Sequence, residues 1–268
     1  MFFHTLITRW YVFVFLVAFL VIGIRTRGVV RTLLFLAGGY LIAWISEASS
    51  IRTGFPYGWY FYIYENLRGE WMNRGVPVWD SLSYVFLCFA GLSLSEFVVG
   101  KIPPVPPLTK GGWGGFKLAL LSALFVLILD LVIDPLAHMG DRWFLGKIYY
   151  YPNPGLYFGV PLSNFAGWFL VSFAIVGVNL MLERFFKPSA INHLPSTINH
   201  QPSTFPDKYS GPLLYFGIFL FNFAITLRIG EFRLALMDLV WISIPAYLFV
   251  KAAKARNQRA ESGKRKTD

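Results

Sequence analysis

Five polar residues at the ends of apolar segments could carry out acid–base chemistry in this sequence. Asp130 and Asp134 are four residues apart, so they share one face if their segment is helical. Glu47, Asp80 and Asn164 lie at the ends of three other apolar segments. Burial raises the pKa of a carboxyl group, so one such group can keep its proton near neutral pH and act as a general acid. A second carboxylate, or the Asn164 amide, could then activate or orient a water molecule.

These residues occur in two similar units, residues 47–80 and 130–164. Each unit starts with a carboxylate near the end of an apolar segment, and each closes with Gly-Val-Pro before the next one. The pattern indicates an internal repeat of two-helix units. Pro77 and Pro161 come where a first-turn proline loses no hydrogen bond, which favours a helix start at each.

The elements that must position these residues are predicted to be membrane-spanning helices. Of the 268 residues, 56% are hydrophobic and only 14% are charged, whereas about a quarter are charged in a soluble domain. The apolar runs are close to the length of about 20 residues that crosses a bilayer, and they lack the period-two alternation of barrel strands. We therefore predict an all-α polytopic bundle of about seven spans, at residues 10–24, 29–48, 78–99, 116–137, 160–182, 212–227 and 232–250.

We expect residues 1–250 to form one membrane domain and residues 251–268 to form a disordered tail. Much of the net charge of +10 lies in this basic tail. Such a tail is typical of a cytoplasmic anchor against anionic lipid headgroups, in a multi-pass protein of the cell membrane, and not of a nucleic-acid-binding arm. Two crossings separate the two units, so both of their loops, and all five polar residues, are predicted to lie at the opposite membrane face.

Both loops are rich in aromatic residues, with YGWYFYIY at 57–64 and YYYP at 149–152. Amphipathic rings prefer the membrane interface. Aromatic faces could also line an apolar pocket and stabilise a developing cation. The single cysteine, Cys88, lies inside an apolar run, and we predict that it is a core residue.

Two histidine patterns could bind a metal. Asp134 and His138 have i, i+4 spacing, but Pro135 lies between them and is expected to disrupt the helix just after Asp134. His193 and His200 belong to the near-duplicate strings INHLPST and INHQPST in a polar loop, which we interpret as a duplication without function. We therefore predict neither a metal site nor a cofactor.

Four strings within residues 46–182 carry a family resemblance: EASSIRTGFPYGWYFY, GVPVWDSLSY, DLVIDPLAHMGDRWF and GLYFGVPLSNFAGW. They resemble the carotenoid-biosynthesis membrane proteins that include carotenoid 1,2-hydratases and bisanhydrobacterioruberin hydratases. The resemblance implies addition of water across the terminal 1,2 double bond of an acyclic carotenoid end group, without a redox cofactor. The implied partners are membrane lipid, the polyene and water. The positions within the resembling motifs are Glu47, Arg52, Gly54, Tyr57, Asp80, Asp130, Asp134, Pro135, Asn164 and Trp168.

The roles of these residues are hypotheses. Asp134 is our first choice for the acid, with Asp130 beside it. Glu47 or Asp80 would activate water, and Asn164 would orient it. The predicted substrate-binding residues are Arg52, Tyr57, Trp59, Trp79 and Trp168.

Two other classes of function stay open. The D-x-x-x-D spacing of Asp130 and Asp134 is also typical of metal-dependent prenyl-transferring membrane enzymes, although these need a second acidic cluster and Glu47 and Asp80 are isolated in sequence. A non-catalytic carotenoid-binding, lipid-binding or transport protein also fits the composition. A retinal protein does not, because residues 232–250 contain no lysine for a Schiff base.

Overall fold

A computed structural model describes residues 1–99, 113–185 and 205–264. These residues form eight α-helices, of which α1 (Phe2–Thr8) is short and the other seven are long and apolar enough to cross a membrane. The prediction of an all-α membrane bundle with seven spans is confirmed. The seven helices are α2 (Trp10–Arg27), α3 (Val29–Thr53), α4 (Val78–Val99), α5 (Trp113–His138), α6 (Leu162–Phe185), α7 (Phe205–Arg228) and α8 (Phe232–Lys264).

Helix α4 forms the core of the bundle. It packs against α2, α3, α5 and α7, and most of its side chains are buried, including Cys88 as predicted. A helix that is apolar all round belongs inside a bundle, where every face meets another helix. The outer helices instead expose apolar side chains such as Leu41 of α3 and Leu236 of α8.

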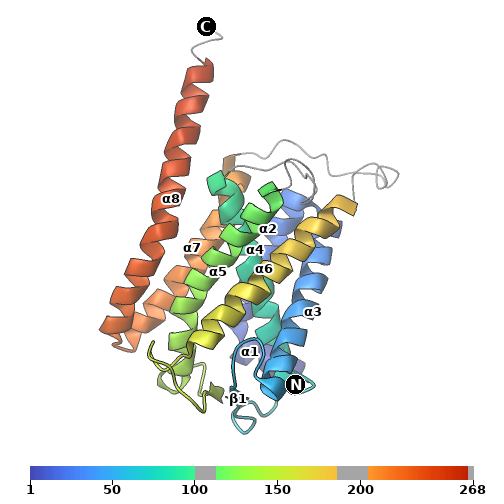
Figure 1. Ribbon diagram of the computed structural model, residues 1–268, viewed down its shortest axis with the longest axis vertical. Helices are drawn as coiled ribbons and strands as arrows, with labels where there is room; N and C mark the ends of the chain where they lie inside the picture. Colours follow the sequence, from blue (N-terminus) through green and yellow to red (C-terminus); the bar gives the residue numbers. More distant parts are fainter. Residues whose placement is uncertain (100–112, 186–204, 265–268) are drawn as a thin grey trace.

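Helix α8 is longer than the sequence predicted. It continues to Lys264, so the expected disorder from residue 251 onward is wrong for this part of the tail. The segment KAAKARNQRAE is rich in strong helix formers, which explains why the helix does not stop at the last apolar residue. Figure 1 shows α8 reaching beyond the other helices at the end of the bundle opposite β1.

The two aromatic loops meet at one end of the bundle (Figure 1). Strand β1 (Phe61–Tyr62), from the loop after α3, pairs antiparallel with β4 (Tyr149–Tyr150), from the loop after α5. Strands β2 (Met72–Asn73) and β3 (Val76–Pro77) form a hairpin that leads into α4. The prediction that both loops lie at one end of the bundle is therefore confirmed.

The three prolines near the site differ in position. Pro77 and Pro161 come directly before α4 and α6, so both mark helix starts as predicted. Pro135 lies inside α5, which continues to His138, so the expected disruption just after Asp134 is wrong. Proline cannot donate to the carbonyl four residues back, that of Leu131. The Tyr157 hydroxyl donates to this carbonyl oxygen instead, at 3.3 Å, so the loop supplies the missing donor. His193 and His200 lie outside the described residues.

Candidate functional site

Strand alternation turns four tyrosine side chains toward the interior of the bundle. Successive side chains of a strand point to opposite faces. Phe61 of β1 and Tyr150 of β4 are accordingly exposed, and the tyrosines on either side of each are buried. These four are Tyr60, Tyr62, Tyr149 and Tyr151.

The carboxylate of Asp134 accepts three hydrogen bonds. The Tyr149 hydroxyl donates to Oδ1 at 2.5 Å, the Tyr151 hydroxyl donates to Oδ2 at 2.6 Å, and Asn164 Nδ2 donates to Oδ2 at 2.9 Å. Hydrogen bonds to an ionised acceptor are the strong ones. The three donors therefore stabilise the negative charge that Asp134 carries once it has given up a proton.

Glu47 and Asp80 are joined through Tyr62. The Tyr62 hydroxyl oxygen lies 2.5 Å from Asp80 Oδ2 and 3.2 Å from Glu47 Oε2, and Tyr60 donates to the same Glu47 oxygen. A hydroxyl group has one hydrogen to donate, so Tyr62 serves one carboxylate at a time. This arrangement allows a proton to pass between Glu47 and Asp80 through the Tyr62 hydroxyl.

The four tyrosines are held as neutral donors. Burial raises the pKa of Tyr60, Tyr62, Tyr149 and Tyr151 well above the usual value, and the nearest carboxylates raise it further. A tyrosine with so high a pKa keeps its hydrogen at neutral pH. Each can hydrogen-bond a carboxylate, and none acts as a base there.

These groups line a small cavity of about 50 Å³. That volume holds about one or two water molecules, at about 30 Å³ each in the liquid. The Trp168 ring stacks on Tyr84, with ring centroids 3.8 Å apart and an interplanar angle of 9°. Acidic and hydrogen-bonding groups thus share the cavity with aromatic rings. The lining residues are Glu47, Tyr57, Tyr60, Tyr62, Asp80, Asp134, Tyr149, Tyr151, Asn164 and Trp168.

Asp130, one helical turn before Asp134, is not among the residues that line the cavity. Its Oδ2 is 3.4 Å from Asn164 Nδ2, and its Oδ1 is buried without a hydrogen-bond partner among the described residues. The Asn164 amide therefore bridges the two aspartates. No group of three His, Cys, Asp or Glu side chains in the described part of the chain could hold a metal ion.

Two glycines let the loop after α3 approach the helices. Gly54 ends α3 in the left-handed conformation, with φ +78°. In α6, a Cβ added to Gly167 would come 2.5 Å from Tyr57 Cδ1 and 2.9 Å from the Pro56 carbonyl oxygen. Tyr57 therefore packs directly on the α6 backbone, with its hydroxyl 2.7 Å from Ser46 Oγ.

Three of the predicted substrate-binding residues do not line the cavity. Arg52 is exposed and donates to the carbonyl oxygens of Ala48 and Arg74. Trp59 is turned outward by the same alternation that buries Tyr60, and it stacks on Phe61. Trp79 is buried, but its indole N–H donates to Glu70 at 2.5 Å.

A buried ion pair that sequence reasoning missed fixes the start of α4. Arg9 and Glu70, each with a side chain 3% exposed, lie 2.5 Å apart. Arg9 also donates to the Leu145 carbonyl oxygen at 2.6 Å, and its guanidinium lies 4.7 Å from the Trp79 ring centroid. The Arg9–Glu70 pair therefore connects both loops to Trp79, the residue next to Asp80.

The four tyrosines were also missed as site residues. The sequence carried a signal for them, because Tyr60 and Tyr62, like Tyr149 and Tyr151, have the period-two spacing of a strand with one buried face. From the sequence they were expected as interfacial aromatic residues or as the walls of an apolar pocket, and not as hydrogen-bond donors to the carboxylates.

Comparison with known proteins identifies the family. A family model described as carotenoid biosynthesis protein matches residues 7–226. This range contains every residue of the cavity lining and ends within α7. No curated protein and no solved structure matches this chain. The chain therefore belongs to the family of carotenoid biosynthesis proteins, as the motifs in residues 46–182 predicted.

Proposed function

We propose that this protein is a hydratase that adds water across the terminal 1,2 double bond of an acyclic carotenoid end group. One observation carries the proposal: a single small cavity is lined by Asp134 with its three donors and by the Glu47–Asp80 pair. Hydration of an alkene requires an acid that protonates carbon and a base that accepts a proton from water. The reaction transfers no electrons, so its balance requires no oxidant or reductant.

In the first step, Asp134 in its protonated form donates to the alkene carbon whose protonation leaves a tertiary cation. The O–H bond of the acid breaks and a C–H bond forms. The carboxylate that remains is stabilised by Tyr149, Tyr151 and Asn164, which are already in place before the reaction. The Trp168 ring, at the edge of the same cavity, would stabilise the cation through its π face.

In the second step, water attacks the tertiary cation and forms a C–O bond. Glu47 or Asp80 accepts the proton that this water loses, and the Asn164 amide would orient the water. The product is a tertiary alcohol. One proton has then moved from Asp134 to the Glu47–Asp80 pair, so a proton must return to Asp134 before the next reaction.

The size of the cavity supports water, and not the polyene, as the molecule that occupies it before the substrate binds. About 50 Å³ accommodates water but is too small for the branched end group of a carotenoid. We expect the half-buried Trp168 side chain to move when the substrate binds. The apolar polyene would arrive from the lipid, which would surround the exposed apolar side chains of the outer helices.

We also propose that the protein lies in the cell membrane with the basic end of α8 in the cytoplasm. Basic residues next to a span favour the cytoplasmic side. Figure 1 shows the two paired loops at the end of the bundle opposite the end of α8, so the cavity would lie near the non-cytoplasmic face.

The hydratase proposal is tested by expressing the protein in a host that accumulates lycopene and measuring the pigments by mass spectrometry. The expected product gains the mass of one water molecule for each modified end. Unchanged pigment, repeated with several acyclic carotenoids and with the protein verified in the membrane, would contradict the proposal. If unchanged carotenoid were to co-purify with the protein, a binding or transport role would replace it.

A further inference from the structure

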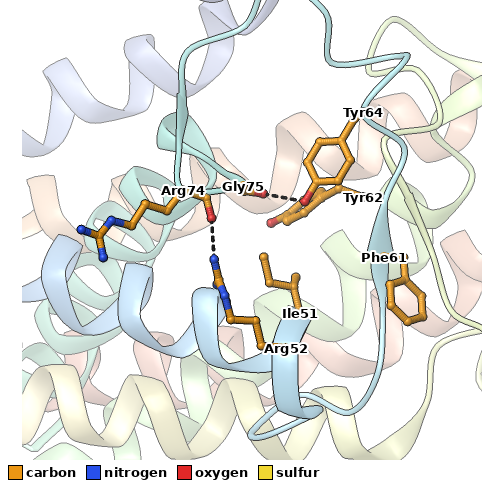
Figure 2. Close-up of a pocket in the computed structure, with 7 residues that line it drawn as sticks. All are labelled: Ile51, Arg52, Phe61, Tyr62, Tyr64, Arg74 and Gly75. Carbon is orange, nitrogen blue, oxygen red and sulfur yellow. Dashed lines mark hydrogen bonds between the residues drawn. The ribbon is translucent and has the colours of Figure 1, made fainter.

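A larger pocket opens at the surface beside the cavity. Its volume is about 320 Å³, and its walls come from the end of α3, strand β1 with the residues after it, and the turn between β2 and β3 (Figure 2). We call it the outer pocket. Among the described residues, Tyr62 is the one that lines both the outer pocket and the cavity.

The outer pocket has the polar groups that hold water. Arg52 donates to the Arg74 carbonyl oxygen at 2.9 Å, and the Tyr64 hydroxyl donates to the Gly75 carbonyl oxygen at 3.2 Å (Figure 2). Arg52 and Tyr64 are both exposed. A guanidinium has more donors, and each carbonyl has a second lone pair, for solvent. The volume corresponds to about ten water molecules at the density of the liquid.

Tyr62 separates the outer pocket from the carboxylates. The side chain is buried, and its ring centroid lies 6.3 Å from that of Tyr64, which is exposed. Its hydroxyl is in contact with Asp80 and Glu47 on the cavity side. Tyr62 therefore lies between the outer pocket and the proposed base.

We propose that the outer pocket is a water-binding site through which water enters the cavity past Tyr62. This inference rests on the proposed hydration, in which each reaction consumes one water molecule. It gives the two substrates separate routes, with water arriving at the polar end of the bundle and the polyene arriving from the lipid. The Tyr62 hydroxyl lies where it would hydrogen-bond an incoming water molecule next to Glu47 and Asp80.

The test fills the outer pocket and measures whether water still reaches the cavity. Ile51→Trp enlarges a side chain that lines the pocket, and Ile45→Trp is the matched control because Ile45, on the same helix, is 53% exposed and outside the pocket lining. Hydroxyl-radical labelling of Tyr60 and Tyr62, measured by mass spectrometry after brief radiolysis, depends on nearby water and requires no carotenoid. We expect labelling of both to fall several-fold in Ile51→Trp and to stay at the wild-type level in Ile45→Trp.

A second variant guards against misfolding of the first. Ile51→Ala widens the pocket, and we expect it to increase labelling of Tyr60. Wild-type labelling in both Ile51 variants would overturn the proposal. Carotenoid conversion is measured on the same samples: if the wild-type protein converts nothing, the hydratase proposal fails while labelling still decides the route of water. If the wild-type protein is active, Ile51→Trp should slow it several-fold, and an unchanged rate would overturn the outer pocket as the water entrance.

Discussion

Tyr62 and Tyr149 are direct partners in the β1–β4 ladder, and their hydroxyls bind carboxylates from different helices. Tyr62 binds Asp80 of α4, and Tyr149 binds Asp134 of α5, each at 2.5 Å. One short ladder between two distant loops therefore fixes the position of the proposed acid relative to the proposed base. In this member of the carotenoid biosynthesis family, the proposed proton donor and the proposed proton acceptor thus line the same small cavity.

The first prediction concerns the acid. Asp134→Asn should lower product formation by about 100-fold or more, since general acid catalysis contributes at least about that factor and an amide cannot replace the acid. Asp141→Asn is the control, because Asp141 is an exposed carboxylate in the loop after α5. Product is measured by chromatography of extracted pigments, and equal amounts of protein in the membrane fraction are verified. Activity retained in Asp134→Asn would remove Asp134 from the acid role.

The second prediction concerns the donors to Asp134. A hydrogen bond to a charged group contributes about 1.5–3 kcal/mol, so Tyr149→Phe or Tyr151→Phe should each slow the reaction by about 10-fold to 100-fold. Tyr150→Phe removes the same hydroxyl from the intervening exposed residue and should leave the rate unchanged. Initial rates with purified protein measure the effect. Equal effects at all three positions would contradict the alternation of buried and exposed tyrosines.

The third prediction concerns the contact between Tyr57 and α6. Gly167→Ala places a methyl group against Tyr57 and should destabilise the protein by about 1–3 kcal/mol, the usual effect of overpacking. Gly177→Ala in the same helix meets no atom within 4 Å and should stabilise the helix by up to about 1 kcal/mol. Thermal unfolding in detergent measures the change in stability of both variants. A stable, fully active Gly167→Ala protein would show that this close approach does not position the loop.

The fourth prediction concerns the ion pair at the start of α4. Glu70→Gln leaves the buried Arg9 charge uncompensated and should lower the free energy of unfolding by about 3–5 kcal/mol. Glu231→Gln breaks the Arg142–Glu231 pair, whose side chains are 40% and 27% exposed, and should lower it by at most about 1 kcal/mol. Denaturant titration in mixed micelles measures both values. Similar losses for the two variants would mean that the Arg9–Glu70 pair has little structural role.

Much of the fold could be predicted from the sequence because lipid leaves few alternatives. Apolar runs of membrane length separated by polar or Gly- and Pro-rich segments had to be helices, and parity of crossings put both loops at one end. Two details of the helices differ from the prediction. The extension of α8 past residue 251 depends on helix propensity and not on hydropathy, and Pro135 stays inside α5 because Tyr157, far along the chain, donates to Leu131.

For the candidate site, the sequence predicted the approximate location of the carboxylates but not the groups that hydrogen-bond them. Topology alone placed Glu47, Asp80, Asp130, Asp134 and Asn164 at one membrane face. The structure brings all of these except Asp130 to one cavity. The pairing of β1 with β4 is a contact between distant segments that no local pattern specifies. The sequence therefore did not show that the buried tyrosines meet the carboxylates, or that Trp59 lies outside the cavity lining. The Arg9–Glu70 pair was missed for the same reason.

The origin of the oxygen in the product tests the proposed hydration most directly. Purified protein is incubated with an acyclic carotenoid in ¹⁸O-labelled water without oxygen gas, in parallel with Asp134→Asn, and the pigments are analysed by mass spectrometry. With the wild-type protein, each modified end should gain one molecule of labelled water, and the variant should form almost no product. Unlabelled product, a requirement for oxygen gas, or equal product from the variant would contradict this proposal.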